Sequence, residues 1–322
     1  MNALILPAIQ QPLLYGYVPD LKPEKGEVLV SLHAAALNHR DLFITQGLYP
    51  GIKVPCILGA DGAGEWRGKR VVIYPAFEWG TNPNHQGKNF RVLGMPEDGT
   101  FAEQIRVPRG NVFVAPDHLN MEQAAALPLA GLTAWRTVFT RCQLKKGEKV
   151  LITGIGGGVA LTALQMAVAV GAEVYVSSGS TEKIEKALEM GAKHGESYRE
   201  VGWDKRLKQA SGGFDVIIDA AGGEGFALLA AICNPGARIG FYGGTLGLVN
   251  GLSLQPIFWK QISLLGSTMG SPQEFKAMLA FVQKNNLIPM VDTIYQLREG
   301  NEALDRMRQG GQFGKLVLKI AD

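Results

Sequence analysis

Closely spaced glycines between an apolar strand and an apolar helix are the first feature of this sequence with chemical meaning. The strand is predicted at residues 150–153, and residues 159–170 predict a helix that ends at Gly171. Glycine lets a backbone approach an anion closely, and the N–H groups at a helix start attract negative charge. The pattern predicts a phosphate-binding turn, formed by Gly154, Gly156, Gly157 and Gly158 with Val159 at the helix start.

A second predicted strand at residues 174–176 completes a strand–helix–strand unit of about 30 residues, the length typical of dinucleotide binding. When the pattern G-x-G-x-x-G is read here, Ile155 and Ala160 stand at the first and last glycine places. Alanine still allows close packing of helix and strand, and Gly154 can make the tight turn instead of Ile155. The alternative is a glycine-rich turn in an ordinary α/β domain.

The residues after the second strand predict which nicotinamide cofactor binds. An NAD site places Asp or Glu there, about 20 residues after the glycines, to bind the ribose 2′-hydroxyl. This chain has Ser177 and Ser178, and Lys183 lies in the first turn of the next helix, where a cation opposes the helix dipole. A 2′-phosphate bound by these residues accounts for both features, so we predict NADP(H). The alternative is a solvated lysine beside serines that cap the helix.

Strands and helices alternate from residue 148 onward, which predicts an α/β fold with a doubly wound parallel sheet covered by helices. The later strands are predicted at residues 214–219, 237–242 and 262–266, and the helices at 181–190 and 224–233.

Residues 1–120 contain short strands between glycine and proline turns, with one helical stretch at residues 38–45, and predict a β-rich domain. In the following segment, Pro128 and Gly131 are expected to break two short helices. The tail is expected to return to the first domain. The predicted division is a β-rich domain, 1–120 completed by 268–322, and a nucleotide-binding domain, 121–267. The clearest early strands are 27–32, 70–74 and 101–107, and the tail holds helices at 272–284 and 299–308 and a strand at 315–320.

Composition indicates a globular protein that does not bind nucleic acid. The 322 residues carry a net charge of +3 with no basic run, and 46% are hydrophobic. No apolar stretch reaches the roughly 18 residues of a membrane span, and the first residues lack a basic signal region. Three separated cysteines indicate reduced, packed thiols, so we expect a cytoplasmic protein. They are Cys56, Cys142 and Cys233.

Several segments in family order resemble the medium-chain dehydrogenase/reductase superfamily, over essentially the whole chain. They are ALNHRDLFITQGLYPGIKVPCILGADGAGEW, DGTFAEQIRVP, LPLAGLTAW, the glycine turn and a final GKLVL. The sequence is most similar to the zinc-free, quinone-oxidoreductase-like branch. This resemblance implies a GroES-like β domain, a Rossmann domain, a nicotinamide held between them, and a homodimer joined through the last Rossmann strand.

The resemblance makes zinc the first functional question. Zinc-dependent members carry Cys where this chain has Asn38, and Gly-His-Glu where it has Gly59, Ala60 and Asp61. Neither Asn nor Ala supplies a thiolate or imidazole for a catalytic zinc. The loop at residues 77–97, where the family binds structural zinc, contains no cysteine. His39 and His85 are expected to be hydrogen-bonded loop residues, and we expect a metal-free protein.

By the same resemblance, Lys183 and Tyr198 hold the 2′-phosphate. Asn38 lies beside the nicotinamide, where it donates or accepts a hydrogen bond, or else only caps the next helix. Tyr49 lines the acceptor pocket by stacking or by donating its hydroxyl, or else only covers the domain edge. Also placed beside the ring are Thr133, Gly243, Gly244 and Thr245.

Without a Lewis acid, alcohol oxidation lacks its usual stabilisation of an alkoxide. Quinones and α,β-unsaturated carbonyls delocalise the charge themselves, so we predict an NADPH-dependent reductase of such acceptors. Asp41 and Asp61 are expected to be structural, and solvent is expected to protonate the product. The alternatives are a zinc-type alcohol dehydrogenase and a non-catalytic NADPH-binding protein.

Overall fold

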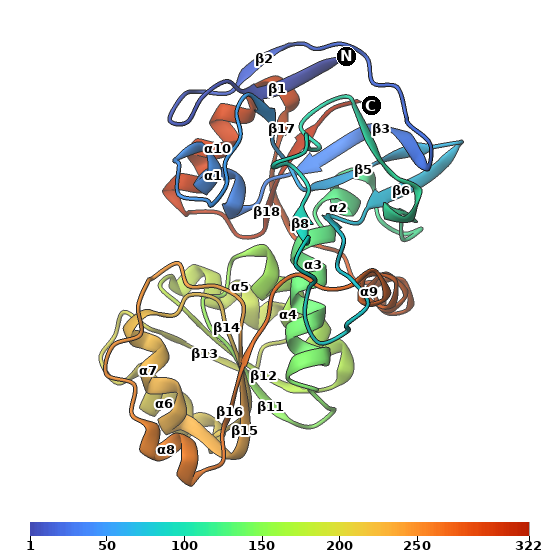
Figure 1. Ribbon diagram of the computed structural model, residues 1–322. Helices are drawn as coiled ribbons and strands as arrows, with labels where there is room; N and C mark the ends of the chain where they lie inside the picture. The colour runs from blue at the N-terminus through green and yellow to red at the C-terminus, as the bar shows by residue number, and fades with distance from the viewer. Residues whose placement is uncertain (322) are drawn as a thin grey trace. The chain divides into compact units, whose positions relative to one another are not determined.

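The computed structural model describes residues 1–321, which form two compact units (Figure 1). The first unit contains residues 1–132 and the tail from Gly270, and the second contains Thr133–Met269. The first unit thus extends beyond residue 120, where the sequence pattern changes. Within residues 1–321, no helix is both long and apolar enough to span a membrane.

The first unit is built around a seven-stranded sheet. β3 (Glu27–Ala36) is its central strand, because it pairs with β5, β9 and β18. The terminal strand β18 (Lys315–Lys319) lies antiparallel to β3, with Val317 opposite Ala36, so the tail of the chain returns to this unit. The other strands of this sheet are β5 (Asp61–Trp66), β6 (Lys69–Ile73), β9 (Gln104–Pro108), β10 (Val112–Val114) and β17 (Val291–Gln296).

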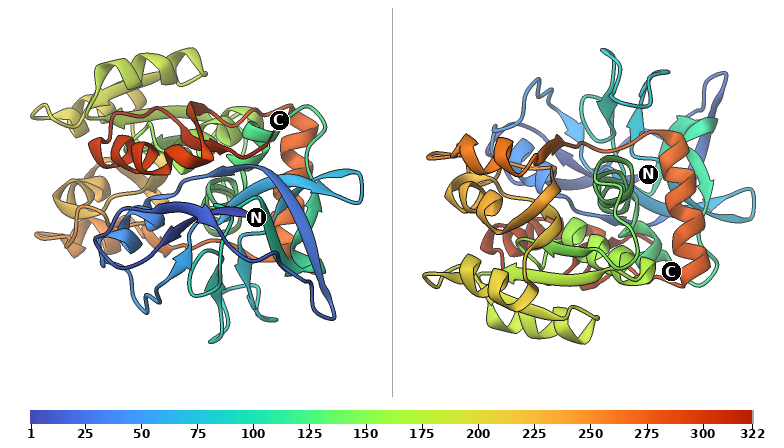
Figure 2. Two further views of the ribbon diagram at one scale, coloured as in Figure 1. Left: turned by 90° about the horizontal axis from the view of Figure 1, so that it is seen from above. Right: turned by 90° about the horizontal axis from the view of Figure 1, so that it is seen from below.

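Within residues 1–321, two smaller sheets and several helices complete this β-rich unit. α9 packs on β10 and on the residue that follows β6 through ring contacts of Phe275 with Phe113 and Tyr74, and Figure 2 shows it beside β10. The smaller strands are β1 (Asn2–Leu6), β2 (Leu14–Tyr17), β4 (Cys56–Ile57), β7 (Ala76–Phe77) and β8 (Arg91–Val92). The α-helices are α1 (His39–Thr45), α2 (Met121–Ala125), α9 (Pro272–Asn285) and α10 (Gly300–Gln309), and α3 (Pro128–Trp135) begins in this unit and ends in the second.

The predicted helix break at Gly131 is wrong. Pro128 is the first residue of α3, as expected for proline, but α3 continues through Gly131 to Trp135. A Cβ at position 131 would lie 2.7 Å from Leu127 Cδ1 and 3.2 Å from Met278 Sδ. The glycine therefore allows α9 to pack closely on α3, which is a tertiary requirement.

The second unit is a six-stranded parallel sheet in the order β13-β12-β11-β14-β15-β16. In chain order this is 3-2-1-4-5-6, the order of dinucleotide-binding Rossmann domains. The doubly wound fold predicted from the sequence is therefore confirmed. The strands are β11 (Lys149–Ile152), β12 (Glu173–Ser178), β13 (His194–Ser197), β14 (Phe214–Asp219), β15 (Cys233–Phe241) and β16 (Ser263–Gly266).

Helices cover both faces of this sheet (Figure 1). Trp203 and Leu207 of α6 share one apolar cluster with Phe226 and Leu229 of α7 and with Ile217 of the sheet. α4 lies on the opposite face. The helices are α4 (Gly158–Val170), α5 (Thr181–Glu189), α6 (Trp203–Ser211), α7 (Gly223–Ile232) and α8 (Leu254–Trp259).

Candidate functional site

The glycine turn joins β11 to α4 in a backbone conformation that depends on glycine. Gly154 and Gly156 have φ values of +64° and +131°, which L-residues with a side chain rarely adopt. Gly154 therefore makes the tight turn, while Ile155 is buried and donates its N–H to the Ser177 carbonyl at 2.9 Å. Gly157 caps α4, so the first N–H groups of the helix, which have no intrahelical acceptor, follow the turn directly.

The turn lies where the strand order reverses. β11 pairs with β12 on one side and with β14 on the other, so its carboxyl end is the switch point at which such sheets bind ligands. Asp219 ends β14 beside it and accepts hydrogen bonds from Thr153 Oγ1 at 2.6 Å and from the Gly222 N–H at 2.8 Å. Asp219 was missed at the sequence level, although its position after an apolar strand was a usable signal.

Cationic and hydroxyl groups gather at the carboxyl end of β12. The stem of Lys183 crosses the glycine turn, because a Cβ on Gly156 would lie 2.8 Å from Lys183 Cδ and 3.3 Å from its Nζ. A Cβ on Gly179 would lie 2.9 Å from both Tyr198 Oη and Arg199 Nε. The structure thus brings three of the predicted groups, Ser178, Lys183 and Tyr198, to neighbouring positions and adds Arg199, which the sequence did not indicate.

The two serines of this strand end have different surroundings. The Ser178 hydroxyl donates to the Ile155 carbonyl at 3.2 Å and accepts from the Ser180 N–H at 3.3 Å. Ser177 Oγ is buried and has no hydrogen-bond partner among the described residues. Ser180 caps α5, since its hydroxyl accepts from the Lys183 N–H. A serine therefore caps this helix, as the alternative interpretation expects. The cap uses only the backbone N–H of Lys183, and the Lys183 side chain lies over the glycine turn.

The remaining predicted residues of the second unit occupy helix α3 and the loop after β15. Thr133 is buried, and its carbonyl accepts a hydrogen bond from Thr137 Oγ1 at 2.7 Å. Gly243 lies against the loop that follows β14, because a Cβ there would be 2.3 Å from the Ala220 carbonyl. Gly244 and Thr245 follow in an exposed segment.

In the first unit, a buried lysine joins two residues at the start of α1 and of β5. Lys315 Nζ donates to Asn38 Oδ1 at 2.6 Å and to Asp61 Oδ2 at 2.9 Å. Asn38 Nδ2 donates to the same Asp61 oxygen at 2.9 Å, and Leu129 N–H donates to the other at 2.7 Å. The exposed fractions are 8% for Asn38, 0% for Asp61 and 6% for Lys315, so the triangle is almost fully shielded from water. The sequence indicated no role for Lys315.

The helix that begins after Asn38 is anchored by its own charged residues. Asp41 Oδ2 accepts from the Asn38 backbone N–H at 2.8 Å, which caps α1. The Arg40 guanidinium lies 5.1 Å from the Tyr49 ring centre and donates to the Leu93 carbonyl at 2.7 Å. Tyr49 is partly buried against the apolar core of this unit. Desolvation and then the Lys315 charge lower the pKa of His39.

Asp41 makes a testable contribution to stability. Burial raises its pKa to about 6, against the opposing effects of Arg40 and the Asn38 N–H. Between about pH 4 and pH 6, the folded protein therefore keeps a proton that the unfolded chain has released, and the free energy of unfolding decreases as pH rises through this window. For one group this loss is about 3 kcal/mol.

We expect Asp41→Asn, which still accepts from the Asn38 N–H, to remove that loss. In urea unfolding, the gain in stability of the variant over wild type should be about 2 kcal/mol larger at pH 7 than at pH 4.5. A difference between the two proteins that is the same at both pH values would contradict this assignment.

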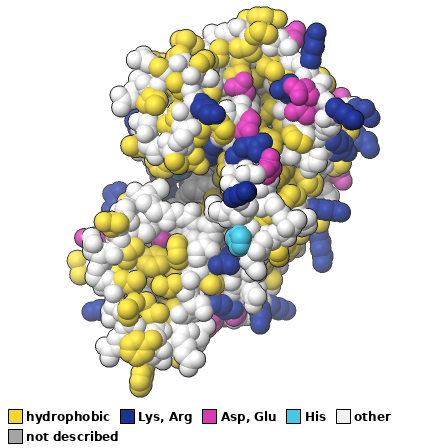
Figure 3. Space-filling model, in the orientation of Figure 1, with side chains coloured by type: hydrophobic (Ala, Val, Ile, Leu, Met, Phe, Trp, Pro, Cys, Tyr) yellow, Lys and Arg dark blue, Asp and Glu magenta, His cyan; other side chains and the backbone are white. Residues whose placement is uncertain are grey.

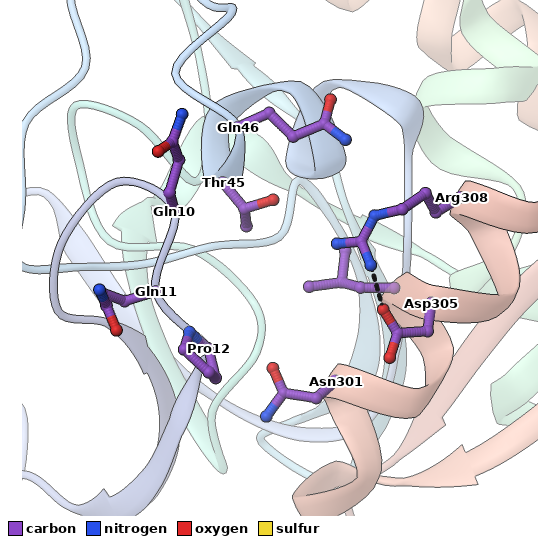
Figure 4. Close-up of a pocket in the computed structure, with 9 residues that line it drawn as sticks. Gln10, Gln11, Pro12, Thr45, Gln46, Asn301, Asp305 and Arg308 are labelled. Atoms are coloured by element: carbon purple, nitrogen blue, oxygen red, sulfur yellow. Dashed lines mark hydrogen bonds and ion pairs between the residues drawn. The ribbon is translucent and has the colours of Figure 1, made fainter.

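A separate hollow of about 440 Å³ opens in the first unit, at the ends of α1 and α10 (Figure 4). Asn301 closes one side by exchanging hydrogen bonds with the Leu13 backbone at 2.9 and 3.0 Å, and Asp305 is paired with Arg308. None of the predicted site residues lines it. Its lining residues are Gln10, Gln11, Pro12, Thr45, Gln46, Asn301, Leu304, Asp305 and Arg308.

A Rossmann sheet with a glycine turn at its switch point, joined to a β-rich unit, defines a two-domain dehydrogenase. Comparison with known families agrees. The chain matches the model of the alcohol dehydrogenase GroES-like domain at residues 24–117 and that of the zinc-binding dehydrogenase at residues 158–284. The chain belongs to the medium-chain dehydrogenase/reductase superfamily and is an oxidoreductase, for which a nicotinamide cofactor is expected.

Individual relatives carry more than one functional description. A zinc-type alcohol dehydrogenase-like protein, YogA, from Leptosphaeria maculans is 35% identical over 97% of this chain and 96% of its own. The crystal structure of an NAD-dependent alcohol dehydrogenase is 31% identical, covers 100% of both chains and has a TM-score of 0.94. The quinone oxidoreductase of Thermus thermophilus, also crystallised with NADPH, is 25% identical over 99% of this chain and 100% of its own, with a TM-score of 0.83.

The zinc implied by some of these descriptions does not fit the donor atoms present. A catalytic zinc needs three protein ligands from thiolate, imidazole or carboxylate, and within residues 1–321 no cluster of three such residues exists. Where a zinc enzyme has two of its ligands, this chain has an amide and an alanine, and the Asp61 carboxylate is paired with the Lys315 ammonium. The loop that would hold structural zinc is instead organised by Arg91, which pairs with Glu78 and Glu97.

Proposed function

We propose that this protein is a zinc-independent, NADPH-dependent oxidoreductase that transfers hydride to a quinone or an α,β-unsaturated carbonyl. The observation that carries the proposal is the Lys315 ammonium bonded to Asn38 and Asp61. A positive charge already satisfies the carboxylate, so a divalent cation would have to displace it. An acceptor that delocalises its own negative charge does not require a metal ion.

The strand end in the second unit supports NADPH. Bound NADPH would supply the hydride, and its diphosphate would take the N–H groups at the start of α4, after Gly156, Gly157 and Gly158. Its 2′-phosphate would lie among Ser178, Lys183, Tyr198 and Arg199, at a strand end that carries serines where an NAD site has Asp or Glu. The unpartnered Ser177 hydroxyl is a further donor at this strand end.

The first unit supplies groups for the acceptor. We assign Asn38 a hydrogen bond to the acceptor oxygen or to the cofactor ribose, and Tyr49 an aromatic wall for a flat acceptor. Thr133 and the segment of Gly243, Gly244 and Thr245 would contact the nicotinamide end. Solvent supplies the proton that completes the reduction.

A panel assay tests the function against its two competitors. After treatment with a chelator and removal of that chelator, the protein should oxidise NADPH with quinones and 2-alkenals as acceptors. Elemental analysis of the purified protein should find no stoichiometric zinc. The names of two relatives favour a zinc alcohol dehydrogenase. Stoichiometric zinc with chelator-sensitive alcohol oxidation would support that function, whereas tight NADPH binding without any turnover would support a non-catalytic protein.

Lys183 should set the preference for the phosphorylated cofactor. A hydrogen bond to a charged group contributes about 1.5–3 kcal/mol, so Lys183→Gln should weaken NADPH binding about tenfold or more while changing NADH binding less than about threefold. Lys186→Gln on the same helix is the matched control, because Lys186 pairs with Glu182 at 2.6 Å instead. Equal losses for both nucleotides, measured by fluorescence titration, would remove the 2′-phosphate assignment.

We also propose a cytoplasmic homodimer joined through the second unit. β16 is an edge strand of the parallel sheet, and an unpaired edge is a template for another strand. Beside it, α8 exposes 66% of Phe258 and 80% of Trp259, and hydrophobic side chains gather on this part of the unit in Figure 3. Analytical ultracentrifugation should give twice the mass of the chain, and a monomer at micromolar concentration would contradict the proposal.

A further inference from the structure

We propose that Lys315 is a positioning residue that fixes the side-chain amide of Asn38 in one orientation, with its nitrogen available to donate to the acceptor or the ribose. This inference rests on the proposed function, and it replaces the open question of whether Asn38 donates or accepts.

The chemistry of the two partners decides the orientation of the amide. An ammonium can only donate, so the Asn38 atom 2.6 Å from Lys315 Nζ must be the carbonyl oxygen. A carboxylate can only accept, so the atom 2.9 Å from Asp61 Oδ2 must be the amide nitrogen. If the amide were flipped, its NH₂ group would face the Lys315 ammonium and its carbonyl oxygen would face the Asp61 carboxylate, and neither pair could form a hydrogen bond. The amide NH₂ carries two hydrogens, and the bond to Asp61 uses one of them.

Burial makes this orientation rigid. All three residues are at least nine-tenths shielded from water, so a lost hydrogen bond would not be replaced by solvent. Asp61 is itself held by the Leu129 N–H at 2.7 Å, and its backbone carbonyl accepts from Thr100 Oγ1 at 2.7 Å. The donor end of Asn38 is therefore preorganised, and preorganised donors stabilise developing negative charge most effectively.

Lys315→Met tests the inference, because methionine has a similar length and cannot donate. The turnover number with the best acceptor should fall about 10- to 100-fold, the scale of a misplaced contact, while NADPH binding changes less than about threefold. In an Asn38→Ala background, Lys315→Met should lower the turnover number less than about twofold, because no amide remains to be positioned. Lys319→Met on the same strand is the control and should leave turnover unchanged.

Two additions keep the test decisive. If the uncompensated Asp61 charge unfolds the single variant, the charge-neutral pair Lys315→Met with Asp61→Asn replaces it, and turnover should still be reduced. The side-chain amide signals of Asn38 in ¹⁵N NMR, assigned by their absence in Asn38→Ala, should exchange slowly in wild type and rapidly in Lys315→Met.

The outcomes separate this inference from the proposed function. If wild type reduces no acceptor, the proposed function fails, and the NMR result alone decides whether Lys315 positions Asn38. Unchanged amide signals in Lys315→Met would overturn the inference, as would an equal loss of turnover with and without Asn38.

Discussion

Replacing Gly156 by valine should weaken NADPH binding at least about 100-fold, a loss of about 2.7 kcal/mol or more. The residue has a φ of +131°, and a Cβ there would lie 2.8 Å from Lys183 Cδ. A valine would therefore force the backbone to change, displace the Lys183 stem, and occupy space that the proposed diphosphate site needs at the start of α4.

The control for this variant is another glycine with positive φ in the same unit. Gly236 has a φ of +74° and no neighbouring atom within 4 Å of an added Cβ, so Gly236→Ala introduces backbone strain alone. Strain of this kind costs about 1–3 kcal/mol of stability, but NADPH binding should stay within about twofold of wild type. If Gly156→Val bound NADPH as tightly as Gly236→Ala does, the glycine turn would not be the diphosphate site.

Replacing Gly64 by alanine should destabilise the first unit by about 3 kcal/mol. Gly64 lies on β5 opposite Leu32, where the pairing of β3 with β5 shifts by one residue. This bulge brings the β3 backbone so close that a Cβ on Gly64 would lie 2.0 Å from the Ser31 carbonyl oxygen and 2.8 Å from Leu32 Cα. Both neighbours are backbone atoms, so the methyl group can only be accommodated if the central strands of the sheet separate.

Gly16→Ala is the matched control, because Gly16 also lies in a strand but has no atom within 4 Å of an added Cβ. Thermal and urea unfolding should show a change of less than about 0.5 kcal/mol for Gly16→Ala. A Gly64→Ala protein as stable as the Gly16→Ala protein would show that the bulge is not as tightly packed as described.

The nucleotide-binding unit was largely predictable because its determinants are local in sequence. The strand predicted at residues 214–219 is β14, and the helix predicted at residues 181–190 corresponds to α5, because apolar runs and glycine stops encode each element separately. Counting from the glycine turn pointed to Ser178, and Lys183 followed from its place in the first turn of the next helix, whereas Tyr198 was indicated only by the family resemblance.

The centre of the first unit could not be predicted in this way. Lys315 is 277 residues from Asn38 and 254 from Asp61, and only the pairing of β18 with β3 brings its side chain to them. Sequence patterns report periodicity and turns, which are local, whereas this triangle depends on the register between distant strands. The helix break predicted at Gly131 is wrong for the same reason, since the role of this glycine depends on its contact with α9, far along the chain.

The most direct test of the account is a crystal structure of the protein grown with NADPH. We predict the diphosphate at the N-terminus of α4, next to Gly156 and Gly157, and the 2′-phosphate within hydrogen-bonding distance of Ser178 and of the Lys183 ammonium. We also predict no metal ion at Asn38 and Asp61. NADPH bound away from the glycine turn would contradict the proposed cofactor site, and a zinc ion in place of the Lys315 ammonium would contradict the proposed zinc-independent function.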